Sequence, residues 1–193
     1  LAITVTAYDT YDNVDTNYDY TSSSPVSVTF SGANSATTYP SATDDRANPT
    51  CTDYGGTARN FAVATQLTFT DGVATSTMKL RKAETAHIEA TAGSITSTAD
   101  DGYDLDVTVS SSTASILTWG TQYAAGSKVV KSAPWNRFTV NVSDGYGNVA
   151  TSSVNVTVTP TGGTATAGST ATVAASSGVA TFTNFAVTCP SYP

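Results

Sequence analysis

Ile3-Thr4-Val5-Thr6-Ala7-Tyr8-Asp9-Thr10-Tyr11-Asp12-Asn13-Val14 recurs 135 residues later as Phe138-Thr139-Val140-Asn141-Val142-Ser143-Asp144-Gly145-Tyr146-Gly147-Asn148-Val149. A second match has another spacing, because Gly72-Val73-Ala74-Thr75 returns 106 residues later as Gly178-Val179-Ala180-Thr181. Self-similarity at a fixed offset indicates two copies of one supersecondary unit. The two offsets differ by 29 residues, so the first copy is longer by that number, and most of the excess falls between Ser31 and Gln66.

The composition favours β-structure in two small domains. The 193 residues suit domains at 1–109 and 110–193, each of a size that can bury its own modest core. Only 12% of the residues are charged. Thr, Ser, Val and Ala are abundant, and β-branched side chains fit a pleated surface well. An all-β fold is therefore expected.

Apolar and polar residues alternate in short runs, which is the pattern of half-buried strands. Short strands separated by Gly and Asp turns predict two tandem β-sandwiches. The runs in the first copy are 2–7, 25–30, 67–70, 73–80, 86–92 and 95–109, the last interrupted by a turn at 100–102. Those in the second copy are 115–119, 128–131, 138–142, 153–159, 170–174 and 179–187.

The repeated pattern resembles a known family. Ile3-Thr-Val-Thr-Ala-Tyr-Asp-x-Tyr-x-Asn13, followed by Leu67-Thr-Phe-Thr-Asp-Gly-Val-Ala-Thr75, is similar to the bacterial immunoglobulin-like (Big-type) repeats of large surface and secreted proteins. This resemblance covers nearly the whole chain and implies two immunoglobulin-like sandwiches. It also implies an extracellular or cell-surface location, in spacers, adhesin stalks or fibre subunits. The fold by itself does not define a function.

The two copies are incomplete in complementary ways. Only Leu1 and Ala2 precede the first shared strand, whereas the second copy has residues 110–137 before it, so the first copy lacks an opening strand. The second copy has no counterpart of 88–109, its last two strands. A sheet edge left open exposes unpaired backbone groups. Two explanations remain open: the chain is an excerpt of a longer repeat protein, or subunits complete one another by strand donation.

An acidic loop follows the first shared strand and supports two interpretations. Its carboxylate and amide oxygens, with those of the second copy, are ligands that calcium accepts. Alternatively, each Asp–Asn pair forms a turn in which the aspartate bonds its own backbone. The spacing does not match an EF-hand, because Tyr20 stands where glycine is required. The candidate calcium ligands are Asp9, Asp12, Asn13, Asp15, Asp144 and Asn148.

Three further features concern covalent modification and chemistry. Cys51 and Cys189 occupy non-equivalent positions, and in an oxidising compartment exposed thiols are expected to pair. Since one extended tandem would hold them too far apart, we expect any bridge to join neighbouring molecules or residues outside this segment. Asn141 and Asn155 fit the N-glycosylation pattern. His87 is the sole histidine, and no nucleophile motif accompanies it.

Charge and motifs argue against several classes of function. A net charge of -7 disfavours nucleic acid, and no apolar run is long enough for a membrane span. We therefore expect a non-enzymatic structural module of an extracellular fibre, stalk or surface layer, whose partners are copies of itself or neighbouring repeats. No cofactor is expected beyond calcium. The alternative is an adhesion or glycan-binding module that uses the 31–66 insertion as a recognition loop.

Overall fold

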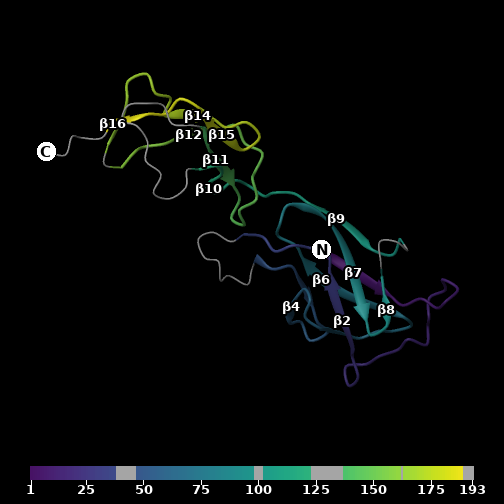
Figure 1. Cartoon of the computed structure of the whole chain (residues 1–193). Coiled ribbons are helices and arrows are strands. Elements are labelled where there is room, and N and C mark those ends of the chain that lie inside the picture. Colours follow the sequence, from purple (N-terminus) through teal and green to yellow (C-terminus); the bar gives the residue numbers. More distant parts are fainter. Residues whose placement is uncertain (38–46, 98–101, 123–136, 162, 189–193) are drawn as a thin grey trace. The chain divides into compact units, whose positions relative to one another are not determined.

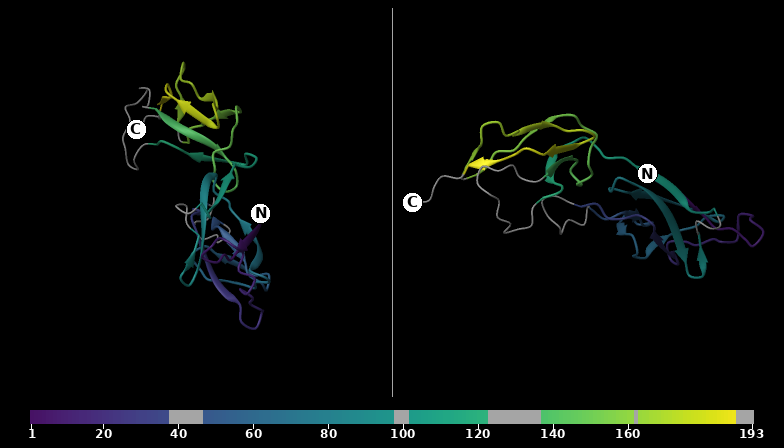
Figure 2. Two further views of the ribbon diagram at one scale, coloured as in Figure 1. Left: turned by 90° about the vertical axis from the view of Figure 1, so that its right-hand side faces the viewer. Right: turned by 45° about the horizontal axis from the view of Figure 1, so that its top comes forward.

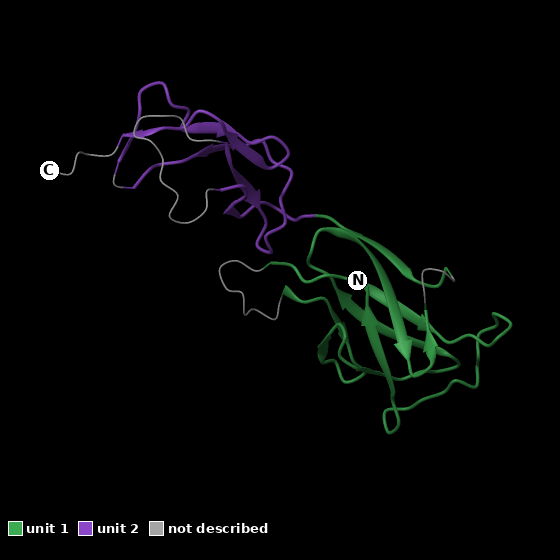
Figure 3. Cartoon of the chain, in the orientation of Figure 1, with its two compact units in different colours: residues 1–110 green, residues 111–193 purple. Residues whose placement is uncertain are grey.

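The computed structural model describes residues 1–37, 47–97, 102–122, 137–161 and 163–188 (Figure 1). These residues form antiparallel β-sheets and contain no α-helix, which confirms the all-β prediction. The chain divides into two compact units, Leu1–Ser110 (unit 1) and Ser111–Pro193 (unit 2), coloured separately in Figure 3. Figure 2 shows the strands of each unit from two further sides.

Unit 1 is a β-sandwich of two sheets. The first sheet has the strand order β1 (Ala2–Thr6), β6 (Val73–Lys79), β3 (Thr50–Thr52), β4 (Ala58–Asn60). The second has the order β5 (Thr65–Leu67), β2 (Val26–Ser31), β7 (Glu84–Ala92), and both β8 (Ile95–Thr96) and β9 (Leu105–Val109) pair with β7. The predicted long strand over 95–109 is thus two strands beside one partner.

The core of unit 1 lies between these sheets. Successive side chains of a strand point to opposite faces, so alternate residues meet the opposite sheet. The first sheet contributes Ile3, Cys51, Ala74 and Met78. The second contributes Val28, Phe30, Leu67, Ala86 and Ile88.

Unit 2 repeats part of this plan. Its main sheet has the order β10 (Ile116–Trp119), β11 (Phe138–Ser143), β15 (Val179–Phe182). Two strand pairs accompany it, β12 (Asn155–Thr157) with β14 (Thr172–Ala174) and β13 (Thr164–Ala165) with β16 (Val187–Thr188). The buried aromatic residues Phe138, Phe182 and Phe185 anchor its core.

The repeated segments that begin at Gly72 and Gly178 each contain the end of a hairpin turn, and the two turns have the same geometry. They are Thr70–Val73 and Ser176–Val179, and in each the outer residues exchange two backbone hydrogen bonds of 3.0 Å. The two central residues have φ of 49° and 79° in the first turn and 48° and 80° in the second. Positive φ at both central positions defines the type I′ turn, whose twist matches that of paired strands.

The insertion at 31–66 differs from the prediction of a recognition loop. Its described part supplies β3 and β4, and β3 lies between β6 and β4 within the first sheet. Three-residue strands give too little alternation for a sequence pattern to identify them. The predicted strand at 128–131 lies outside the described residues, and the predicted strand over 179–187 is interrupted between β15 and β16.

Among the described residues, neither unit contains the strands that the repeat comparison predicts to be missing. In unit 2, β11 pairs with β10 on one side and with β15 on the other. Its counterpart β1 pairs with β6 alone among the described strands. Conversely, β2 pairs with β5 and β7, whereas β12 pairs only with β14 in the described part of unit 2. The described strands agree with the prediction of two β-sandwiches, whereas the absence of further strands stays a prediction.

Candidate strand-binding groove

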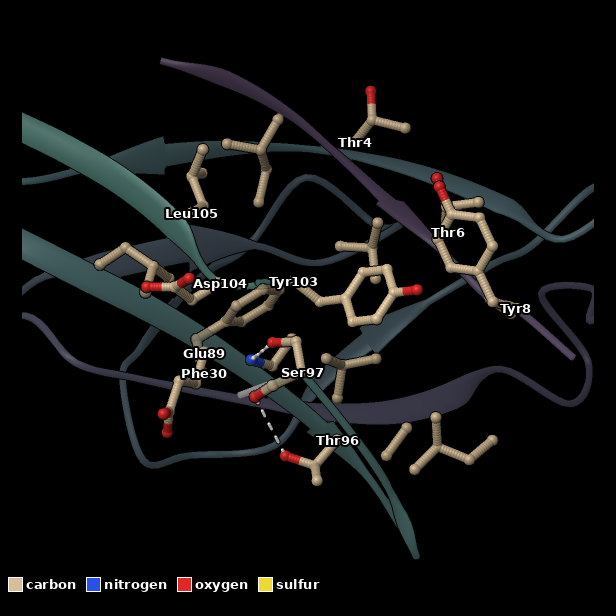
Figure 4. A pocket seen from close by; sticks show the side chains of 18 of the residues that line it. Thr4, Thr6, Tyr8, Phe30, Glu89, Thr96, Ser97, Tyr103, Asp104 and Leu105 are labelled. Carbon is tan, nitrogen blue, oxygen red and sulfur yellow. Dashed lines mark hydrogen bonds between the residues drawn. The ribbon is translucent and has the colours of Figure 1, made fainter. Parts of the chain in front are cut away.

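A groove of about 510 Å³ opens in unit 1 beside the free edge of β1. Figure 4 shows Thr4 and Thr6 on β1 and Tyr8 just beyond its end, with Tyr103, Asp104 and Leu105 on the opposite side of the groove. Its floor is the sandwich core itself, formed by Ile3, Val28, Phe30, Phe69, Met78 and Ile88. The groove therefore separates the last strand of one sheet from β8 and β9, at the margin of the other.

The backbone of β1 leaves hydrogen-bonding groups directed at this groove. Ala7 donates its N–H to Gly72 at 2.8 Å, and Leu1 exchanges hydrogen bonds with Met78 at 2.8 and 3.0 Å. Because backbone groups alternate in direction along an antiparallel strand, the odd-numbered residues of β1 face β6. The N–H and C=O groups of Thr4 and Thr6 consequently face away from β6, where no described strand pairs with them.

Large apolar side chains line the groove while remaining exposed. The exposed fractions are 46% for Tyr8, 50% for Ile95, 47% for Tyr103 and 40% for Leu105. Contiguous exposed apolar surface above a core floor is typical of an interaction site. The groove thus combines a surface for apolar side chains with unpaired backbone groups on β1. Both are required for the addition of a strand.

One end of the groove is closed by an aromatic contact. The Tyr103 hydroxyl donates a hydrogen bond of 2.6 Å to the Asp12 carboxylate, and its ring lies 5.6 Å from the ring of Tyr8. The unobstructed part of the edge therefore runs from Ile3 to Ala7. The lining carboxylates are Asp9, Asp12, Glu89 and Asp104, and the lining residues that the structure describes include neither Lys nor Arg.

The predicted calcium ligands form matching turns in the two units. The carboxylate of Asp9 accepts the backbone N–H of Asn13 at 3.0 Å, and that of Asp144 accepts the N–H of Asn148 at 3.0 Å. Each also accepts the N–H two residues ahead, at 2.8 and 2.9 Å. Both asparagine side chains donate back to the same carboxylate. This geometry agrees with the turn interpretation.

The structure does not gather the acidic loop into a calcium cage. Asp12 accepts the Tyr103 hydroxyl, and Asp15 accepts the N–H of Asn17 at 3.0 Å. These hydrogen bonds engage one oxygen each of Asp12 and Asp15, and calcium binding at Asp9, Asp12 and Asp15 stays a prediction.

The equivalent aspartates of the two units differ in burial. Asp144 is 1% exposed and accepts the N–H of Ser112, just before β10, at 3.0 Å. Burial acts to raise the pKa of Asp144, but hydrogen bonds from Asn148, Ser112 and Tyr146 outweigh it, so the pKa is lowered. Asp9 is exposed, and backbone hydrogen bonds from Asn13 and Tyr11 lower its pKa.

A second polar cluster was not predicted from the sequence. His87 on β7 and Asp106 on β9 are directly opposite partners, and His87 Nδ1 lies 2.5 Å from Asp106 Oδ1 and 3.3 Å from Asp104 Oδ2. Among the described residues these three form the one group whose ligand atoms lie close enough for a metal ion. Glu84 and Glu89 are near His87 in the sequence, but the aspartates that face it across the sheet depend on strand register.

Cys51 differs from the exposed thiol that the sequence analysis assumes. It lies on β3 in the core with no exposed surface, and its Sγ is 3.1 Å from Ser76 Oγ. Burial raises the pKa of the Cys51 thiol, although hydrogen bonds from Ser76 and Thr52 act in the opposite direction. The assumption of an exposed Cys51 is wrong, and Cys189 lies outside the described residues.

We expect Cys51 to resist alkylation in the folded protein. A thiol that is buried and protonated reacts slowly, since the thiolate is the nucleophile. Iodoacetamide labelling followed by mass spectrometry should modify Cys51 at least about tenfold faster in denaturant than in buffer. Equal labelling rates in the two conditions, or a disulfide-linked dimer through Cys51, would contradict this placement.

The candidate glycosylation sites lie on strands. Asn141 is half-buried on β11, opposite Thr118 on one side and Val179 on the other. Asn155 is exposed on β12. Glycosylation at these positions stays a prediction.

Comparison with known protein families, with curated proteins and with solved structures found no match. In the described part of the chain, no helix has the length and apolar character needed to cross a membrane.

Proposed function

We propose that the chain is a non-enzymatic structural module of an extracellular fibre, stalk or surface layer, and that its subunits join by strand addition at unit 1. The supporting observation is the free edge of β1 beside a groove whose floor is the sandwich core. Strand addition gives affinity through backbone hydrogen bonds and specificity through alternate side chains.

The chemistry of the groove favours assembly over catalysis. Its lining is dominated by strand backbone, threonine hydroxyls and apolar side chains. The sole histidine, His87, is exposed and faces two carboxylates, while a catalytic base is normally held against a nucleophile. The proposal therefore assigns the open edge a mechanical function.

Proline substitution provides a direct test of assembly. Thr6→Pro removes an N–H that faces away from β6, so the monomer loses no bond of its β1–β6 ladder. A strand added beside β1 would lose its hydrogen bond to the N–H of residue 6 and would clash with the proline ring. Sedimentation velocity over a concentration series should show oligomers for the natural chain, and Thr6→Pro should raise the concentration required for them at least about tenfold.

Ala58→Pro on β4 is the matched control. Asp53 donates to Thr57 and Phe61 donates to Pro49, so the N–H of Ala58 faces outward at the opposite edge of the same sheet. We expect Ala58→Pro to assemble like the natural chain. A natural chain that remains monomeric at every concentration, or equal inhibition by both prolines, would contradict the proposal.

A further inference from the structure

Unit 2 shows what occupies the edge that is free in unit 1. On β11, the strand β10 runs antiparallel in a register that places Leu117 opposite Val142 and Trp119 opposite Val140. Both valines belong to the core of unit 2, and residues directly opposite each other project from the same face of a sheet. Leu117 and Trp119 therefore point to the core side of the sheet.

These two side chains are incompletely covered in their own unit. Leu117 is 53% exposed and Trp119 is 59% exposed, although the Trp119 ring lies 6.1 Å from that of Phe138. In unit 1 the second sheet includes β7, β8 and β9, whereas the described part of unit 2 has no counterpart of these strands. A strand like β10 would consequently bury these positions more fully in the groove of unit 1 than β10 does in unit 2.

The backbone hydrogen bonds of β1 and β11 correspond, so the register of β10 on β11 can be applied to a strand added beside β1. Ala7 donates to Gly72 at 2.8 Å and accepts from Asp15 at 3.0 Å, while Val142 donates to Gly178 at 2.7 Å and accepts from Ala150 at 2.9 Å. The offsets of 135 and 106 residues found in the sequence therefore hold for individual hydrogen bonds as well.

We infer that the groove of unit 1 binds the opening strand of another repeat of this type, an uncharged extended segment with large apolar side chains two residues apart, antiparallel to β1. The first apolar side chain lies against Ala7 and the second against Val5, the positions equivalent to Val142 and Val140. This inference rests on the proposed function and specifies its partner.

Charge supports this choice of occupant. The groove is lined by four carboxylates, Asp9, Asp12, Glu89 and Asp104, and no Lys or Arg is among its described lining residues, although Asp104 lies 3.3 Å from His87. A strand that carried Asp or Glu would be repelled, whereas residues 111–122, which contain β10, carry no charged side chain.

The probe is a fluorescent peptide with the sequence of residues 111–122, added to the full chain and followed by anisotropy. Saturable binding is expected, and Thr6→Pro should weaken it at least about tenfold by removing an edge N–H. In the peptide, Trp119→Asp should abolish binding, whereas Thr118→Lys should not, since position 118 faces away from the core. If Thr6→Pro leaves the affinity for the peptide unchanged, the groove does not bind a strand through its edge and behaves as a site for small apolar ligands. That result overturns the inference.

A disulfide trap tests the register. Thr118 lies opposite Asn141, the counterpart of Thr6, and opposed residues of this kind are about 5.5 Å apart between Cα atoms, within disulfide range. In a Cys189→Ser background, Thr6→Cys should cross-link a Thr118→Cys peptide much faster than an Ile116→Cys peptide. Equal rates, or a peptide that only displaces β10 from unit 2, overturn the inference.

The assembly experiment and the peptide experiments distinguish failure of the proposed function from failure of the inference. A chain that remains monomeric but cross-links the peptide in the expected register contradicts assembly by copies of this chain, and supports the strand-binding groove. A chain that forms oligomers but neither binds nor cross-links the peptide overturns the inference, and leaves assembly through another surface.

Discussion

Gly178→Ala is expected to destabilise unit 2 by about 4 kcal/mol, since it combines an unfavourable φ with a backbone collision. Gly178 has φ of 80°, a region that residues with a Cβ rarely adopt. A Cβ at this position would lie 2.0 Å from the carbonyl oxygen of Ala150, which cannot move without disturbing its own loop. Urea unfolding measures the loss, and both tryptophans, Trp119 and Trp135, belong to unit 2 and report on it.

Gly168→Ala is the matched control for this substitution. Gly168 also lies in unit 2 and has φ of 79°, but a Cβ there would meet no atom within 4 Å. It should cost only about 1 kcal/mol, the conformational part of the effect. Equal losses for the two variants would show that the contact with Ala150 does not constrain the turn.

Asp144→Ala is expected to lower the stability of unit 2 by about 3 kcal/mol at neutral pH, because it removes a buried carboxylate that accepts several partly buried amide hydrogen bonds. The carboxylate accepts the N–H groups of Ser112, Tyr146 and Asn148 and the side-chain amide of Asn148, at 2.9–3.0 Å. The bond to Ser112 also fixes the segment that leads into β10. Tryptophan fluorescence during urea unfolding measures the change.

The effect of Asp144→Ala should depend on pH in a defined direction. The pKa of Asp144 is lower in the folded chain than in the unfolded chain, where an aspartate has a pKa of about 3.9. The ionised group therefore contributes its full stability above that value and loses it as the pH falls through the folded pKa. The difference between the natural chain and Asp144→Ala should be largest at pH 7 and should shrink below about pH 4.

Asp9→Ala is the matched comparison in unit 1. Asp9 forms the same turn, but it is exposed and its unit contains no counterpart of Ser112. We expect a smaller loss of stability there, monitored through the tyrosines. A loss as large as that at Asp144 would mean that the turn alone, rather than burial beneath the opening strand, carries the effect.

The open edge shows how far the sequence alone can lead. The alternation in 2–7 and 138–142 is local, so the repeat and its period of two residues identify both strands and their equivalence. The equivalence of the two strands also marks the side of β1 on which a partner such as β10 would pair. Which side chains form the groove was not predictable, since Ile95 and Leu105 reach it only through the pairing of β8 and β9 with β7.

Chemistry that depends on one residue and its immediate neighbours was predictable, and chemistry that depends on distant contacts was not. The sequence indicated the all-β repeat and the equivalence of the segments at Gly72 and Gly178, and it offered the turn interpretation of the Asp–Asn loops beside the calcium interpretation, because each depends on adjacent residues. Only the tertiary structure decided that Cys51 is buried, that Asp144 is covered while Asp9 is exposed, and that His87 faces two aspartates. Burial and cross-strand pairing arise from contacts between residues far apart in the chain, and no local pattern records them.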